Sequence, residues 1–127
     1  MAKLIREAAK PERILLADDE EMVRKAIRFL LAFSGYQVVE AEDGEDAVRK
    51  YIEASPPIDL VLLDLDMPRL NGLEALARIR VHNPAVRAII LSGGLHSDHL
   101  EQTSFLQKPF DNQQLIGLVR ESLEMEA

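Results

Sequence analysis

The sequence contains no cysteine and no long apolar run. Without cysteine, the protein cannot form a disulfide scaffold, a thiolate zinc site or a cysteine nucleophile. None of its apolar runs approaches the roughly 20 residues that a membrane-spanning helix requires. Residues 1–10 mix charged residues with alanines and lack the apolar stretch of a signal peptide. We therefore expect a cytoplasmic protein without a membrane span.

Acidic residues outnumber basic ones. The 15 lysines and arginines stand against 22 aspartates and glutamates, which gives a net charge of −7. This balance disfavours direct nucleic-acid binding, because such binding requires a basic surface that replaces counterions. A length of 127 residues with 47% hydrophobic residues fits one globular domain. We interpret residues 1–12 as an N-terminal extension or linker and residues 13–127 as the domain.

Short apolar runs recur along the chain and predict five strands. They are rich in leucine and β-branched residues without polar alternation, which is typical of strands buried on both faces of a parallel sheet. The runs lie at residues 13–17, 38–39, 58–63, 86–91 and 105–106.

Segments of helical periodicity lie between most of these runs. They begin near Glu21, Asp43, Gly72 and Asp111. Gly35 is a plausible end for the first helix, Asp43 a cap for the second, and Asp111 with Gln114 a capping box for the last. Alternating strands and helices indicate an α/β fold with a doubly wound five-stranded parallel sheet. We predict the flavodoxin-like strand order 2-1-3-4-5, which makes the first and third strands neighbours.

Acidic residues follow two of the predicted strands directly. Asp18, Asp19 and Glu20 come after the first strand, and Asp64 and Asp66 after the third. At one edge of a parallel sheet these carboxylates would repel one another and raise their pKa values. A hard cation such as Mg²⁺ or Ca²⁺ would relieve that repulsion. Helix capping by Asp19 or Glu20 is the alternative for part of the group.

Two further polar residues fall at strand ends. Ser92 follows the fourth strand and is succeeded by Gly93 and Gly94, and Lys108 follows the fifth strand. Each alone is typical of a turn or a solvated surface. Together with carboxylates and a divalent metal, a hydroxyl and an ammonium group suit phosphoryl transfer to a carboxylate nucleophile.

Four motifs in order resemble the receiver domain of two-component response regulators. They are LLADDE (15–20), DLVLLDLDMP with NGLE (59–68 and 71–74), IILSG (89–93) and FLQKPF (105–110). The resemblance spans about residues 12–124. It implies that Asp64 accepts a phosphoryl group from a partner histidine kinase or phosphotransfer protein. It also implies that Asp18, Asp19, Asp64 and the backbone carbonyl of Asp66 hold Mg²⁺.

The resemblance assigns the remaining polar residues as well. Ser92 corresponds to the hydroxyl residue that bonds the phosphoryl group, and Lys108 to the lysine that pairs with it. Phe105 corresponds to the aromatic switch residue, and the Lys108–Pro109 bond is usually cis in such domains. Phosphorylation would draw Ser92 inward and vacate space for Phe105, so the domain would change its interaction surface.

The chain departs from the family pattern in two places. Only 12 residues, 93–104, separate Ser92 from Phe105, so we predict that the fourth helix is shortened or missing. That helix normally joins the output surface, which puts the usual dimer or partner face in doubt and leaves homodimerisation open. Asp66 lies two positions beyond the acceptor, and we hypothesise that its charge alters dephosphorylation.

Two other functions compete with this interpretation. Asp64-Leu65-Asp66 also resembles the DxD motif of haloacid-dehalogenase-like phosphatases, but Met67–Pro68 departs from it and 127 residues leave little room for a substrate cap. A flavodoxin-like cofactor binder would need a glycine- and serine-rich phosphate loop where Asp18 and Asp19 stand. The segment FLQKPF also resembles receivers fused to hybrid sensor kinases, and the effector is not specified by these residues.

Overall fold

The computed structural model describes residues 11–94 and 100–124, in which five strands alternate with four helices. Of the expected extension 1–12, residues 1–10 lie outside the described residues. The elements are β1 (Arg13–Ala17), α2 (Glu21–Phe33), β2 (Gln37–Ala41), α3 (Gly44–Glu53), β3 (Leu60–Asp64), α4 (Gly72–His82), β4 (Arg87–Ser92), β5 (Thr103–Gln107) and α5 (Asn112–Glu124). All paired strands run parallel in the order β2-β1-β3-β4-β5. The predicted fold class and strand order are confirmed.

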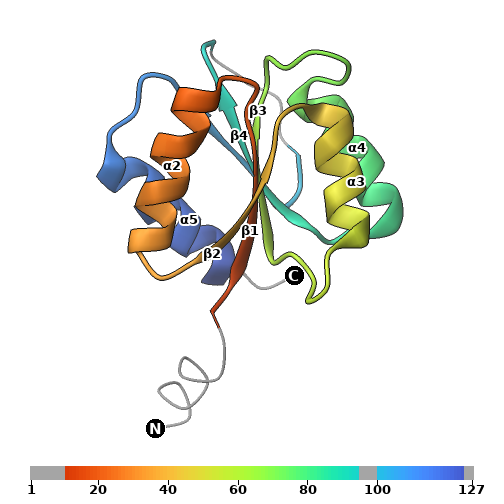
Figure 1. Ribbon diagram of the computed structural model, residues 1–127, viewed down its shortest axis with the longest axis horizontal. Helices are drawn as coiled ribbons and strands as arrows, with labels where there is room; N and C mark the ends of the chain where they lie inside the picture. Colours follow the sequence, from red (N-terminus) through yellow and green to blue (C-terminus); the bar gives the residue numbers. More distant parts are fainter. Residues whose placement is uncertain (1–10, 95–99, 125–127) are drawn as a thin grey trace, which may run out of the picture.

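Helices cover both faces of the sheet (Figure 1). α2 and α5 lie on one face, and α3 and α4 on the other. Side chains of successive strand residues alternate between the two faces, so Leu15 packs in the α3–α4 cluster and Leu16 in the α2–α5 cluster. Every residue of β3 is buried. This explains why the central strands appear in the sequence as continuous apolar runs.

Most helix ends lie where the sequence predicts them. The Asp43 carboxylate accepts the N–H of Asp46 at 2.8 Å, and Asp111 and Gln114 bond reciprocally at 2.8 Å. Gly35 follows α2 with a φ of +100°, which favours glycine. In the described part of the chain, no helix combines the length and apolar character needed to cross a membrane.

The predicted third strand starts two residues too early. β3 begins at Leu60 rather than Ile58 and includes Asp64 as its last residue. At its start, the Asp59 side chain accepts the N–H of Arg13 at 2.8 Å in place of a backbone carbonyl. Because Asp64 belongs to the strand itself, its backbone is held by the ladder to β4.

The connection from β4 to β5 contains no helix in its described residues, 93–94 and 100–102. Residues 95–99 lie outside the described part. Arg80 of α4 donates to the carbonyls of Val86 at 2.9 Å and Gln102 at 3.3 Å, and so ties α4 to the end of this connection. For the described residues, the prediction of a shortened or missing fourth helix is confirmed.

Candidate functional site

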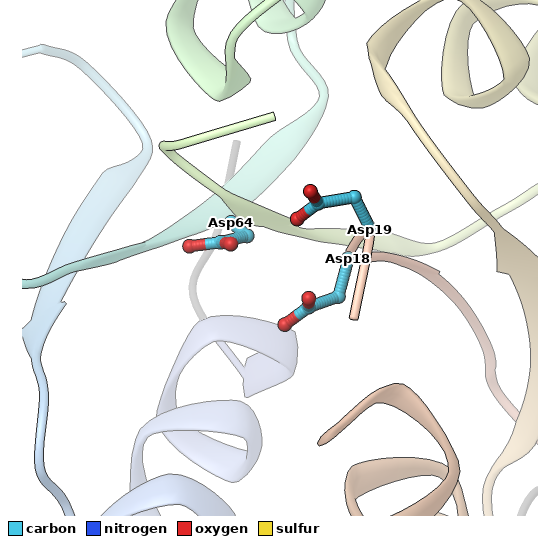
Figure 2. A group of neighbouring side chains, drawn as sticks. All are labelled: Asp18, Asp19 and Asp64. Atoms are coloured by element: carbon cyan, nitrogen blue, oxygen red, sulfur yellow. The ribbon is translucent and has the colours of Figure 1, made fainter. Parts of the chain in front are cut away.

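Three aspartates converge where β1 and β3 end. These strands are neighbours, with Ala17 in register with Leu63, so residues that follow β1 lie beside the end of β3. Asp18, Asp19 and Asp64 each offer one carboxylate oxygen, and these atoms all lie within 4.8 Å of one another. Figure 2 shows the three carboxylates turned toward a common space. We call these three residues the acidic cluster.

All polar atoms of Asp18 but one are hydrogen-bonded. Its N–H donates to the Ala41 carbonyl at 3.2 Å, and its own carbonyl accepts from Arg24 Nη1 at 2.8 Å. Its Oδ1 accepts the N–H of Glu20 at 2.9 Å. Its Oδ2 is buried and has no partner among the described residues. A buried carboxylate oxygen without a donor is costly, so this atom marks a place for a cation.

Helix capping does not account for the acidic residues after β1. Glu20 occupies the N-cap position of α2, but its side chain makes no capping bond. The N–H of Glu20 is bonded instead by the Asp18 side chain, two residues earlier. This bond uses one oxygen of Asp18 and is not a helix cap, so the other carboxylate oxygens of the cluster remain available.

Asp64 is held from the opposite side by the start of α4. The residue is 3% exposed. The N–H of Gly72 donates to the Leu65 carbonyl at 2.9 Å, and a Cβ on Gly72 would lie only 2.5 Å from the Asp64 carbonyl oxygen. Only glycine permits this approach of α4 to β3. The backbone around Asp64 is thus fixed by close packing.

Lys108 brings an ammonium group to the same carboxylate. It follows β5, and its backbone N–H donates to the Ser92 carbonyl at 2.8 Å. Its Nζ lies 3.0 Å from Asp64 Oδ1, and the Lys108–Pro109 peptide bond is cis. The structure therefore brings together four of the predicted site residues: the acidic cluster and Lys108.

Ser92, Phe105 and Asp66 are placed differently. Ser92 ends β4 and is 2% exposed, but its hydroxyl is engaged within its own turn. The hydroxyl accepts the Gly94 N–H at 3.1 Å and donates to the Gly94 carbonyl at 3.2 Å. Phe105 is half-buried against the α3–α4 cluster, opposite Ile90 of β4. Asp66 is exposed beyond the end of β3.

Burial dominates the electrostatics of the cluster. It raises the pKa of Asp18, and repulsion from Asp64 and Asp19 adds to the effect. Burial also raises the pKa of Asp64, although Lys108 and the backbone N–H of Asp66 act in the opposite direction. Burial lowers the pKa of Lys108, but the hydrogen bond to Asp64 and the charges of Asp64, Asp18 and Glu20 together raise it above its ordinary value, which keeps the lysine charged.

The residues present fit a hard divalent cation. The donors are carboxylate oxygens alone, which suit Mg²⁺ or Ca²⁺ rather than softer metals. The Asp18 Oδ2 atom is buried without a partner among the described residues, and burial raises the pKa values of both Asp18 and Asp64, so a cation beside them would stabilise their charged forms. One lysine cannot neutralise three carboxylates. The arrangement can therefore bind a cation beside a nucleophilic carboxylate.

Sequence reasoning missed Arg24. Its guanidinium reaches both the Asp18 carbonyl and the Glu40 carboxylate, and its side chain is only 12% exposed. A signal is present in the sequence, because Arg24 shares an i, i+3, i+7 row with the buried Ile27 and Leu31. A charged residue in such a row requires a partner, but the sequence does not name it.

Comparison with known proteins agrees with this geometry. The family described as response regulator receiver domain matches residues 14–120. The chemotaxis protein CheY of Listeria monocytogenes is 38% identical over 105 residues, which cover 77% of this chain and 87% of that protein. The receiver domain of the hybrid histidine kinase CckA superposes with a TM-score of 0.79 at 34% identity, covering 88% of this chain and 99% of that one.

A further structural neighbour carries ligands. It is CheY from Borrelia burgdorferi in a complex with CheX, BeF3 and Mg²⁺. It superposes with a TM-score of 0.84 at 26% identity, covering 94% of this chain and 95% of that one.

Proposed function

We propose that Asp64 accepts a phosphoryl group in a reaction that depends on Mg²⁺. The premise is that the chain belongs to the response regulator receiver domain family. The observation that carries the proposal is the contact of Lys108 Nζ with Asp64 Oδ1 at 3.0 Å beside the acidic cluster. A buried carboxylate that is paired with an ammonium group and flanked by two further carboxylates suits transfer of a dianionic group.

In this proposal Asp64 is the nucleophile. One of its carboxylate oxygens bonds to phosphorus while the bond from phosphorus to the donor breaks. In a phosphohistidine donor, the electron pair of that bond stays with the imidazole nitrogen. The Lys108 ammonium group pairs with the Asp64 carboxylate before the transfer and with the phosphoryl oxygens after it. The burial of Asp64 keeps competing water away from the reacting atoms.

The cation site consists of the acidic cluster with the backbone carbonyl of Asp66. A bound Mg²⁺ would neutralise charge on both the carboxylate and the incoming phosphoryl group. The buried Oδ2 of Asp18 and the donor set of oxygens support this assignment. Asp19, which is exposed, is the residue that an ion from solvent meets first.

Ser92 and Phe105 form the switch in this proposal. Ser92 must release Gly94 before its hydroxyl can bond a phosphoryl oxygen on Asp64. That movement changes the surroundings of Phe105, which packs opposite the strand that carries Ser92. Phosphorylation of Asp64 thereby shifts the equilibrium between two conformations of Ser92 and Phe105, and a downstream protein binds the altered surface.

The proposed partner is a histidine kinase or phosphotransfer protein, in the cytoplasm. The chain acts as a phosphoacceptor that turns over its own phosphoryl group rather than as a multiple-turnover enzyme. Its membership of the receiver family supports this view.

The test uses acetyl phosphate as a small donor and intact mass spectrometry as readout. We expect one phosphoryl group per chain with Mg²⁺, none with EDTA, and none in Asp64→Asn. Asp66→Asn is the matched control, since it removes a nearby carboxylate without removing the acceptor. Uptake in EDTA or in Asp64→Asn would refute the proposal. Sustained hydrolysis of a phosphate ester over many turnovers would favour the phosphatase alternative.

A further inference from the structure

We propose that Arg24 is a positioning residue for the cation site, because it locks the turn that carries Asp18 and Asp19 onto β2. The inference rests on the proposed function, since it concerns the same cation. It assigns a role to a residue of α2 that contacts no carboxylate of the acidic cluster.

Arg24 is anchored at one end by Glu40 of β2. Its Nε lies 3.0 Å from Glu40 Oε1, and the two side chains are 12% and 20% exposed. Although burial alone would raise the pKa of Glu40, hydrogen bonds from Lys25 and Arg24 hold it below its ordinary value. The backbone of Glu40 is fixed in turn, because Lys50 donates to its carbonyl at 2.7 Å.

The other end of the guanidinium reaches the site. Arg24 Nη1 donates at 2.8 Å to the carbonyl of Asp18, which belongs to the peptide that joins Asp18 to Asp19. Fixing this peptide fixes the backbone from which both carboxylates project. The bonds to Arg24, Ala41 and Glu20 occupy every other polar atom of Asp18. Its Oδ2 is therefore the one polar atom of this residue without a partner among the described residues.

The geometry requires arginine. A planar guanidinium can donate from Nε and Nη1 in two directions at once, whereas a lysine ammonium is a single point on a flexible stem. The same Glu40 carboxylate also pairs with Lys25 at 3.0 Å and Arg28 at 3.1 Å. These two side chains are about half exposed, at 53% and 51%. Among these three partners, the bond to the Asp18 carbonyl belongs to Arg24.

Charge and position predict opposite effects of removing Arg24. Arg24 is a cation near a cation site, so loss of its charge alone would tighten Mg²⁺ binding. Loss of its two hydrogen bonds would free the turn and weaken binding. The sign of the change therefore separates a positioning role from a purely electrostatic one.

The experiment measures Mg²⁺ affinity of the whole chain by isothermal titration calorimetry. We expect Arg24→Gln to weaken binding about tenfold, as is typical when a residue that orients a metal ligand is lost. Lys25→Gln is the matched control, because it removes the same charge from the same carboxylate without touching Asp18. We expect this control to bind Mg²⁺ at least as tightly as the wild type.

Thermal denaturation without metal separates position from stability. If Arg24 serves stability alone, Arg24→Gln lowers the melting temperature but its folded form binds Mg²⁺ as the wild type does, and this result would overturn the proposal. Arg24→Lys keeps the charge and the fold-stabilising pair with Glu40, so it serves if Arg24→Gln does not fold. It should still weaken binding, and wild-type affinity in Arg24→Lys would also overturn the proposal. Absence of Mg²⁺ binding by the wild type itself would instead refute the proposed function.

Discussion

The two sides of the site differ in how far they are assembled. On the β1–β3 side, Asp18 and Asp64 are fixed by backbone bonds and close packing, and their carboxylates already face a common space (Figure 2). On the β4 side, the Ser92 hydroxyl is occupied by Gly94. If the function is as proposed, the part of the site that binds the cation is built in advance, whereas the Ser92 hydroxyl must leave Gly94 before it can contact a phosphoryl group.

The glycines on the two sides show the same difference. A Cβ on Gly72 would collide with the backbone of Asp64, whereas a Cβ on Gly94 would meet no atom of the described residues within 4 Å. Close packing at Gly72 excludes any side chain, whereas the described residues leave room for one at both Gly93 and Gly94, the two residues after Ser92.

The largest effect should come from the residue that joins the two sides. Lys108 bonds the Ser92 carbonyl through its backbone and Asp64 through its ammonium group. We expect Lys108→Gln to slow phosphoryl uptake from acetyl phosphate by about 100-fold, the typical loss when one donor to a developing charge is removed. The initial rate of uptake with saturating Mg²⁺ measures this. A rate within twofold of the wild type would mean that Lys108 does not contact the phosphoryl group.

Asp19→Asn tests whether the acidic side is the cation site. We expect it to weaken Mg²⁺ binding by about 100-fold, the upper end of losses reported for residues that support a metal. Calorimetric titration gives the affinity, with Asp66→Asn as the control that keeps all three carboxylates of the cluster. Equal affinities of Asp19→Asn and the wild type would place the ion elsewhere.

Ser92→Ala should separate the two sides. We expect Mg²⁺ affinity to stay unchanged, because the Ser92 hydroxyl is bonded to Gly94 and not to the cluster. In the phosphorylated form, the equilibrium constant for the conformation in which residue 92 has left Gly94 should fall about tenfold. This is the typical contribution of one hydrogen bond to a charged group. The NMR shifts of Phe105 in the two states report this equilibrium. A change in Mg²⁺ affinity would contradict the separation of the two sides.

The pH dependence of stability tests the crowding of charge on the acidic side. Burial raises the pKa of Asp18 from its ordinary value of 3.8, so the folded state binds this proton more tightly than the unfolded state. Its contribution to stability is then complete below that ordinary value and is lost as pH rises through the raised one. At neutral pH without metal, we expect Asp18→Asn to exceed the wild type in unfolding free energy by roughly 1 kcal/mol.

Denaturation in EDTA over a pH series measures this difference. The gap between Asp18→Asn and the wild type should close as the pH falls toward the ordinary carboxyl range. Mg²⁺ should reverse the order, because it stabilises the wild type by binding the folded form. A gap that widens in acid would contradict the assignment.

The smallest effect concerns Asp66, which lies at the margin of the acidic side. Its side chain is exposed, and we propose that its charge changes the lifetime of the phosphoryl group on Asp64 by a few-fold, within the range of a screened charge interaction. Comparing the half-lives of phosphorylated Asp66→Asn and wild type measures this. Equal half-lives would show that the side-chain charge of Asp66 has no effect on the phosphoryl group.

The same contrast separates what the sequence could predict from what it could not. β1 and the convergence of the acidic cluster follow from continuous apolar runs that end in aspartates, since parallel strands bring such ends to one edge. The bond of Ser92 to Gly94 depends on a loop conformation that two glycines leave open. The partner of Arg24 is Glu40, 16 residues away, and only tertiary packing reveals it.

The exposed face of α2 also escaped prediction. Phe29 and Phe33 are 73% and 83% exposed. Their rings stack on the solvent side of the helix with centroids 6.4 Å apart. Periodicity identifies the inner face through Ile27 and Leu31, but it gives no reason for aromatic residues outside. Nothing in the packing of the core explains these two side chains.

A crystal structure of the chain with Mg²⁺ and beryllofluoride tests the central claim most directly. Our account predicts beryllofluoride on Asp64 in contact with Lys108 and Ser92, with Gly94 released, and Mg²⁺ among the carboxylates of the acidic cluster. Beryllofluoride on another residue, or Mg²⁺ bound away from Asp19 and Asp64, would contradict it.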